Sequence, residues 1–366
     1  MDERVKRIMD ENIIVDALFH TLLKDEPPEC NTEKNIIDMI LEEGVNCIAS
    51  SIIDDDHPIG FKDLCVEVYD HDLLRDCFPD KLLVVVDKVE DIEKAKKEGK
   101  LALIYSTQGS DCLEGDVRFV FLSYKLGIRV MQITYIYECK LGSGAYATLD
   151  NGLTHFGRQV ITEMNHVGVV IDLSHVKDKT AMDAIIRSEK PVIYSHSSVR
   201  ALCNHVRNVS DDHIKSIIDN GGVINLCPHC VFNTNDLSIR PTVDNYINAM
   251  IYIGNIAGTL DNVGIGTDRW SRNTMMNTFK KVGFERTTKG FFGGFDSNSK
   301  HVTKRINRER VRKKYSEVIY FEYIKQIGNK ERSNEVCLQC RKRSKITRYS
   351  YDAADNCRGR GIVKER

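Results

Sequence analysis

The amino-acid sequence predicts an α/β fold, a single eight-stranded (β/α)8 barrel of the TIM type. Two observations lead to this prediction. Short runs rich in β-branched residues recur along the chain with amphipathic helical stretches between them, which is the pattern of β/α units around a parallel sheet. Polar residues suited to catalysis or ligand binding follow nearly every run, and a closed barrel would gather them into one ring.

Eight runs are expected to form the barrel strands, at residues 13–17, 45–49, 101–105, 128–134, 168–172, 191–195, 222–226 and 263–267. A ninth run at 82–86 is either an extra strand or a misread segment. A doubly wound open sheet would show the same alternation, but its ligands collect at one switch point and its edge strands contribute nothing. The spread of polar residues over almost all runs therefore favours the closed barrel.

Two of the helical stretches between the runs carry clear end signals. The stretch NTEKNIIDMILEEG opens with Asn31 and Thr32 and closes on Gly44, and SDDHIKSIIDNGG opens with Ser210 and closes on Gly221. Asn, Thr and Ser accept hydrogen bonds from the first free amides of a helix, and Gly adopts the left-handed conformation that ends one. These local signals agree with the β/α alternation.

Composition places the chain among globular proteins with a large core. Of the 366 residues, 42% are hydrophobic and 29% are charged. The longest apolar stretches fall short of the roughly 20 residues that span a bilayer, so no membrane partner is expected. The first residues lack the apolar run of a secretory signal, which predicts a cytoplasmic location. The twelve cysteines are therefore expected to be reduced thiols, mostly buried, rather than disulfides.

The alternation of strands and helices ends after Asp268, which suggests two parts. We expect a barrel domain at residues 1–300 and a basic C-terminal helix with a poorly ordered tail at 301–366, where Lys and Arg outnumber Asp and Glu by roughly two to one. The tail holds one Cys-x-x-Cys pair, Cys337 and Cys340, whereas a structural zinc takes four ligands. Its few tyrosines do not form a stacking platform, so no specific nucleic-acid partner is expected.

Two histidines follow neighbouring runs. His175 in VVIDLSH and His196 in VIYSHSS are separated by one crossover helix and one strand. Adjacent strands would aim both imidazoles at a common point, as two ligands of a zinc-like ion require. The alternative interpretation is a pair of hydrogen-bonded histidines at the rim of a packed barrel.

Two further residues could complete a reaction site. Asp268 in VGIGTDRW follows the eighth run, where a barrel hydrolase keeps a carboxylate that accepts a proton from metal-bound water, although an Asp here could also cap a turn. Arg207 lies in the loop after the sixth run and could bind a substrate carboxylate with two parallel hydrogen bonds. A surface ion pair with Asp211 or Asp212 is the alternative role for this arginine.

Three strings carry a resemblance to a known family: GLTHFGRQVITEMNHVGVVIDLSHV, YSHSSVRALCNHVRNVSDD and VGIGTDRW closely resemble the membrane (renal) dipeptidase family of zinc peptidases. The similarity extends over residues 13–268. It implies a barrel of the metal-dependent hydrolase kind, with a two-zinc centre whose bridging hydroxide hydrolyses dipeptides. By the same resemblance His175 and His196 are ligands of the second metal, Arg207 binds the substrate carboxylate and Asp268 handles the proton.

Four other positions depart from the family pattern. The His-x-Asp pair for the first metal falls on Leu18 and His20, the bridging glutamate on Gln108, and the substrate-binding histidine on Tyr135. A neutral amide bridges two cations poorly because it supplies no negative charge. We therefore expect one zinc rather than two, held by three histidines with an open fourth position for water, or an empty site.

The predicted function is a dipeptidase-like metal-dependent hydrolase that cleaves the peptide bond of dipeptides, with Asp268 as catalytic residue and Arg207 and Tyr135 as substrate-binding residues. One alternative is a non-peptidase amide hydrolase of the same fold with a single metal. Another is a catalytically silent barrel that acts as a binding or scaffold protein. The expected partner is a dipeptide or a related carboxylated amide, and a homodimer is left open.

Overall fold

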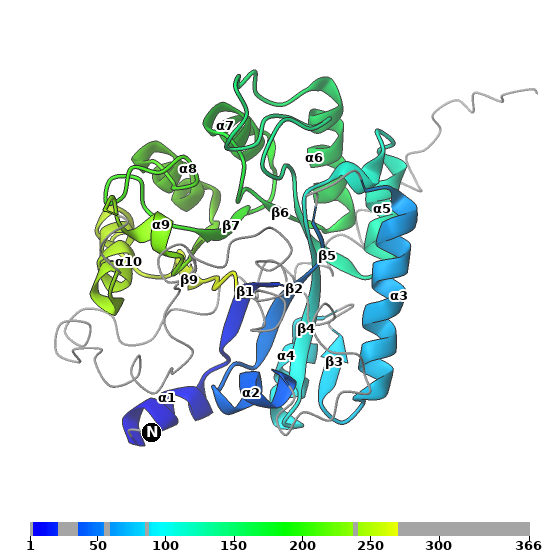
Figure 1. Cartoon of the computed structure of the whole chain (residues 1–366), viewed down its shortest axis with the longest axis vertical. Coiled ribbons are helices and arrows are strands. Elements are labelled where there is room, and N and C mark those ends of the chain that lie inside the picture. The colour runs from blue at the N-terminus through cyan, green and yellow to red at the C-terminus, as the bar shows by residue number, and fades with distance from the viewer. Residues whose placement is uncertain (1–2, 21–35, 55–58, 85–87, 237–240, 270–366) are drawn as a thin grey trace, which may run out of the picture. The chain divides into compact units, whose positions relative to one another are not determined.

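The computed structural model describes residues 3–20, 36–54, 59–84, 88–236 and 241–269 (Figure 1). All of them belong to the first of two compact units of the chain, Met1–Lys330. The proposed domain boundary at residue 300, the basic helix and the tail lie outside the described residues. So does the predicted start of the first helical stretch at Asn31 and Thr32.

The described strands form one parallel sheet in the order β1-β2-β4-β5-β6-β7-β8-β9, with β3 paired to β4 beside this path. All eight predicted barrel strands are confirmed, and the ninth run is an extra strand. The strands are β1 (Val15–His20), β2 (Cys47–Asp54), β3 (Leu82–Val84), β4 (Leu101–Gln108), β5 (Ile128–Gln132), β6 (Val170–Asp172), β7 (Ile193–Ser197), β8 (Val223–Leu226) and β9 (Val263–Ile265).

The sheet closes where the segment after β9 meets β1. The backbone N–H of Asp268 donates to Leu18 O at 3.0 Å, and that of His20 donates to Arg269 O at 2.9 Å. The buried carboxylate of Asp16 accepts hydrogen bonds from both the amide and the hydroxyl of Thr267. In an open sheet the first and last strands would be separate edges, so this seam confirms the barrel over the doubly wound alternative.

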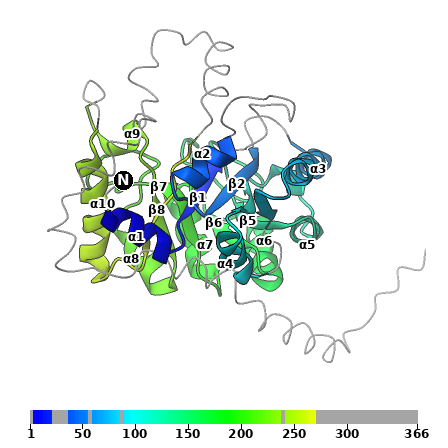
Figure 2. The same ribbon diagram turned by 90° about the horizontal axis from the view of Figure 1, so that it is seen from below.

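The helices cover the outer face of the sheet, as two perpendicular views show (Figures 1 and 2). They are α1 (Glu3–Glu11), α2 (Ile36–Glu42), α3 (Phe61–Cys77), α4 (Glu90–Lys97), the 3-10 turn η1 (Asp111–Leu113), α5 (Arg118–Lys125), α6 (His155–Val167), α7 (Asp178–Arg187), α8 (Asp211–Asn220), α9 (Cys230–Asn233) and α10 (Val243–Ala257). As predicted, Ser210 caps the start of α8 and Gly221 ends it with φ 77°.

Glu114 ends η1 in a left-handed conformation, with φ 53°. Its carboxylate accepts a hydrogen bond from the backbone N–H of Phe61 at 2.9 Å and so caps the start of α3. A cap supplied by a residue so distant in the sequence leaves no local signal.

The core has two layers because successive residues of a strand point to opposite faces. The inner layer consists of small and β-branched side chains such as Cys47, Ala49 and Ile104, and Ile92 and Ala95 of α4 belong to the same cluster. The outer layer, between the sheet and the helices, includes Ile48 and Leu103. Parallel strands buried on both faces explain why the runs are apolar without alternation.

Two expectations from composition concern the whole described part of the chain. None of its helices is long and apolar enough to cross a bilayer. Its eight cysteines are free thiols, and the buried ones are Cys47, Cys112, Cys203, Cys227 and Cys230.

Candidate active site at the carboxyl ends of the strands

The structure brings the two predicted histidines together. His196 is the fourth residue of β7, and His175 lies just past the end of the neighbouring strand β6. Their Nε2 atoms are 2.9 Å apart and their ring centroids 4.9 Å apart. The backbone of His175 is left-handed, with φ 65°, which turns its side chain back towards the end of β7. Both imidazoles thus face the same point.

Burial sets the protonation of these two imidazoles. It lowers the pKa of His175 and of His196 well below the ordinary value of 6.5, and the positive charge of Arg207 lowers both further. Both rings are therefore neutral at pH 7, which is the form whose nitrogen lone pair can bind a metal ion.

A second layer of polar groups holds His196. Its Nδ1 lies 2.7 Å from the hydroxyl oxygen of Ser195, and that hydroxyl donates to the Asp172 carboxylate at 2.5 Å. Asp172 is the last residue of β6 and is only 1% exposed. Sequence reasoning missed both residues, although a carboxylate at the end of the apolar run VVIDL is a recognisable signal.

Asp268 lies in the seam between β9 and β1, just past the carboxyl end of β9. Its backbone is left-handed, with φ 51°. Burial raises the pKa of its carboxyl from 3.8 to about 6, while the charges of His20 and Arg207 act in the opposite direction. The group is therefore ionised at neutral pH and still able to take up a proton.

Arg207 lies in the loop between β7 and α8 and is 5% exposed. Its NH2 group donates to the backbone carbonyl of His196 at 3.2 Å, and its guanidinium carbon lies 5.1 Å from the ring centroid of Phe232. Its Nε is buried and has no hydrogen-bond partner among the described residues. Arg207 is buried and makes no ion pair with Asp211 or Asp212, all three lying in the described part of the chain, and Asp211 accepts hydrogen bonds from Tyr252 instead.

The four positions that depart from the family pattern lie in the second half of their strands or just past them. The ring of Tyr135 stacks on His175 with centroids 4.4 Å apart. Gln108 is buried at the end of β4, and its amide nitrogen donates to the Ser51 hydroxyl at 3.2 Å. Leu18 and His20 both lie in β1, 1% and 5% exposed.

Loop residues that the sequence did not single out surround Arg207. Burial and the charge of Arg207 lower the pKa of His229 to about 4. The rings of His205 and Phe232 lie 5.0 Å apart, and the Tyr146 hydroxyl is 3.5 Å from His205 Nε2. These side chains come from loops after three different strands, β5, β7 and β8, so only the fold gathers them.

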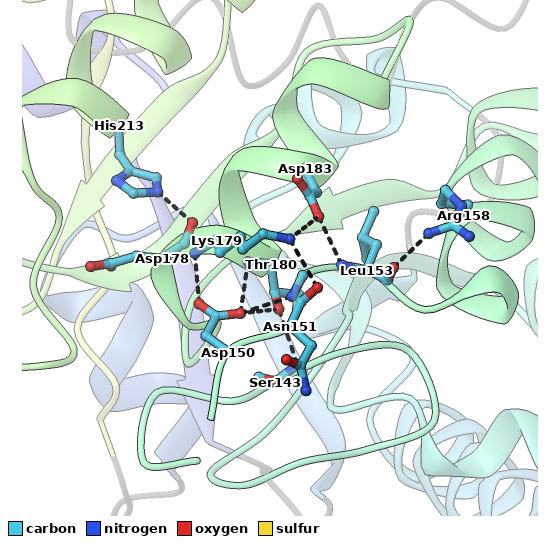
Figure 3. Close-up of polar contacts among 11 residues, drawn as sticks. Ser143, Asp150, Asn151, Leu153, Arg158, Asp178, Lys179, Thr180, Asp183 and His213 are labelled. Atoms are coloured by element: carbon cyan, nitrogen blue, oxygen red, sulfur yellow. Dashed lines mark hydrogen bonds and ion pairs between the residues drawn. The ribbon is translucent and has the colours of Figure 1, made fainter. Parts of the chain in front are cut away.

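The loop between β5 and α6 is fastened to the start of α7 (Figure 3). One oxygen of Asp150 accepts from Lys179 N at 2.6 Å, and the other accepts from the amide and hydroxyl of Thr180 at 3.1 and 2.8 Å. In the same loop the amide of Ala145 donates to the His175 carbonyl at 2.6 Å. The segment that carries His175 is therefore tied to the loop after β5.

The two imidazoles at this site could serve as ligands of one metal ion. Two imidazole nitrogens bound to one zinc lie roughly 3.3 Å apart, given zinc–nitrogen bonds of about 2.0–2.1 Å, so the 2.9 Å pair is close to that spacing. By the family pattern, a second ion would need carboxylates where Gln108 and His20 stand and a histidine where Leu18 stands. Among the described residues no group of three or more His, Cys, Asp or Glu side chains is arranged around one point, so His20 as a third ligand stays a prediction.

Comparisons with known proteins agree on one family. The sequence model described as membrane dipeptidase (peptidase family M19) matches residues 2–283. The dipeptidase tcpJ of Claviceps purpurea is 32% identical over 183 residues, which are 50% of this chain and 43% of that protein. An uncharacterized dipeptidase of Schizosaccharomyces pombe is 32% identical over 191 residues, 51% of this chain and 46% of that protein. The aligned part thus spans less than half the length of the curated relatives.

Solved structures share the fold. An amidohydrolase from Pseudomonas aeruginosa superposes with a TM-score of 0.71 at 27% identity, covering 88% of this chain and 97% of that one. A metallopeptidase from Rhodobacter sphaeroides, liganded with a phosphinate mimic of the dipeptide L-Ala-D-Ala, gives a TM-score of 0.66 at 15% identity and covers 86% of this chain and 98% of that one. At 15% identity the second likeness concerns the fold alone.

Proposed function

Because the chain belongs to the membrane dipeptidase family, peptidase family M19, we propose that it is a dipeptidase-like hydrolase that cleaves the peptide bond of dipeptides at a single metal ion. The observation that carries the proposal is the pair of neutral imidazoles of half-buried His175 and buried His196, with Nε2 atoms 2.9 Å apart. When bound there, a metal ion would lower the pKa of a bound water and polarise the scissile carbonyl. Zinc is the metal we propose, because imidazole is one of its preferred ligands.

Arg207 would bind the free carboxylate of the substrate. A buried guanidinium loses its hydration, and its Nε has no hydrogen-bond partner among the described residues. An incoming carboxylate would supply both the missing acceptor and a compensating charge. A dipeptide bound in this way carries its scissile bond at a fixed distance from the arginine, which favours short substrates over long peptides.

Asp268 would accept a proton from the attacking water and pass it to the leaving amine. Its carboxyl has a pKa of about 6, raised by burial, so it is a base at pH 7 that can also act as an acid. Tyr135 stacks on His175 and would limit how that ring can turn while forming one wall of the substrate site.

The test compares His196→Ala with the parent protein on a panel of dipeptides and measures bound zinc. We expect the parent to bind one equivalent of zinc and to hydrolyse dipeptides, and the variant to lose both. His166→Ala is the control, because His166 lies on the outer face of α6 with its side chain 51% exposed. Equal turnover by the parent and His196→Ala would refute the proposal, as would a parent that binds no zinc.

A cytoplasmic location stays a prediction.

A further inference from the structure

The second layer behind His196 has a defined direction of hydrogen bonding. The Asp172 carboxylate accepts from the amides of Ser174 and Ser195, both at 2.9 Å, and from the Ser195 hydroxyl at 2.5 Å. Burial raises the pKa of the Asp172 carboxyl, but the three donors oppose that rise because they stabilise the charged form. In each of these contacts Asp172 is the acceptor. The Ser195 hydroxyl therefore donates its only proton to Asp172.

A competing acceptor for that proton is weaker. The Ser174 hydroxyl oxygen lies 3.2 Å from Ser195 Oγ, compared with 2.5 Å for the charged oxygen of Asp172. Hydrogen bonds to charged acceptors are shorter and stronger than those between neutral groups. The Ser174 hydroxyl oxygen is itself the acceptor for the backbone N–H of His196 at 2.9 Å.

The tautomer of His196 follows from this direction. Ser195 Oγ lies 2.7 Å from His196 Nδ1 and can only accept in that contact, since its proton is already committed. His196 therefore carries its proton on Nδ1 and has a lone pair on Nε2, the nitrogen that faces His175. In the 2.9 Å contact between the two rings, His175 Nε2 is then the donor and His196 Nε2 the acceptor.

The two histidines are thus not equivalent. His196 is fully buried and its tautomer is fixed from behind. The Nδ1 of His175 is buried without a hydrogen-bond partner among the described residues, so only the contact with His196 sets the tautomer of His175 there. His175 can move its proton from Nε2 to Nδ1 when an ion takes the place of the shared hydrogen bond.

We infer that Asp172 and Ser195 are positioning residues that hold the proton on Nδ1 of His196 and so present its Nε2 as a ready metal ligand. The inference rests on the proposed function in one respect only, which is that His196 Nε2 binds a metal ion. Such outer partners orient the imidazole and raise its basicity, and their loss typically weakens metal binding by about 10–100-fold.

The first test needs no variant and no metal. Nitrogen-15 NMR of the metal-free parent chain reports which nitrogen of each histidine carries the proton. We expect His196 to be protonated on Nδ1 at neutral pH. Protonation on Nε2 instead would overturn the inference, whether or not the protein hydrolyses dipeptides, so this outcome is separate from failure of the proposed function.

The second test measures the dissociation constant of zinc by competition with a chromophoric chelator. Ser195→Ala should bind zinc about 10–100-fold more weakly than the parent, and Ser195→Thr, which keeps a hydroxyl, should recover most of the loss. Ser197→Ala is the matched control: Ser197 lies two residues along β7, is equally buried, and its hydroxyl has no hydrogen-bond partner among the described residues.

Two results would contradict the inference in this second test. Equal losses of zinc affinity in Ser195→Ala and Ser197→Ala would mean that packing controls zinc binding, rather than the hydrogen bonds that link His196 through Ser195 to Asp172. An affinity of Ser195→Ala within about threefold of the parent would mean that the outer partners do not act on the ligand. If Ser195→Ala does not fold, the tautomer measured in the parent still decides the question.

Discussion

The carboxyl of Asp268 should give the proposed reaction a defined pH dependence. Its carboxyl has a pKa of about 6, raised by burial, and the proposed reaction needs the ionised form. Lowering the pH through 6 removes that form, so kcat/KM should fall about tenfold per pH unit below this value. A pH–rate profile of the parent checks this, and Asp268→Asn should show low activity without that acid limb. An unchanged limb in the variant would assign it to another group.

Arg207 can be tested through the group it is proposed to bind. A lysine in its place keeps the charge but loses the planar fork, so Arg207→Lys should lower kcat/KM for dipeptides about 10–100-fold, mainly by raising KM. Dipeptide amides lack the carboxylate, and their slow hydrolysis should be nearly unaffected by the change. Arg187→Lys, in the last turn of α7, serves as control. A similar loss of kcat/KM with the amides would show that Arg207 does not bind the substrate carboxylate.

At the scale of secondary-structure elements, Asp150 joins the loop after β5 to the start of α7 (Figure 3). Asp150→Ala leaves the first amides of α7 without their acceptor, and we expect the free energy of unfolding to fall by about 1–3 kcal/mol. Urea denaturation measures the loss. Asp219→Ala, at an exposed position of α8, should change stability by less than about 0.5 kcal/mol. Comparable losses would disprove a specific role for Asp150.

At the scale of the whole molecule, a metal ion bound only by the folded chain must stabilise it. Zinc at about 100 times its dissociation constant should add about 2.7 kcal/mol to the free energy of unfolding. That should raise Tm by roughly 5 °C, and a chelator should reverse the change. Thermal unfolding of the parent and of His196→Ala with and without zinc checks this. An equal rise in both proteins would place the binding elsewhere.

The sequence predicts the barrel well because each strand is a local apolar run, and even the ninth run proved to be β3. It also predicts that His175 and His196 meet, since neighbouring parallel strands end together. It does not reveal contacts between distant segments, such as the cap that Glu114 gives to α3 or the hydrogen bonds that link Asp172 through Ser195 to His196. Those depend on register and loop path, which a single sequence does not encode locally.

The left-handed backbones of His175 and Asp268 have a consequence for engineering this protein. Side chains with a Cβ atom resist that conformation by about 1–2 kcal/mol, and glycine adopts it without cost. A screen that rewards heat resistance alone would therefore tend to select glycine at both positions and discard the imidazole and the carboxylate together. At these two turns, glycine would favour thermal stability, whereas the proposed reaction requires histidine and aspartate.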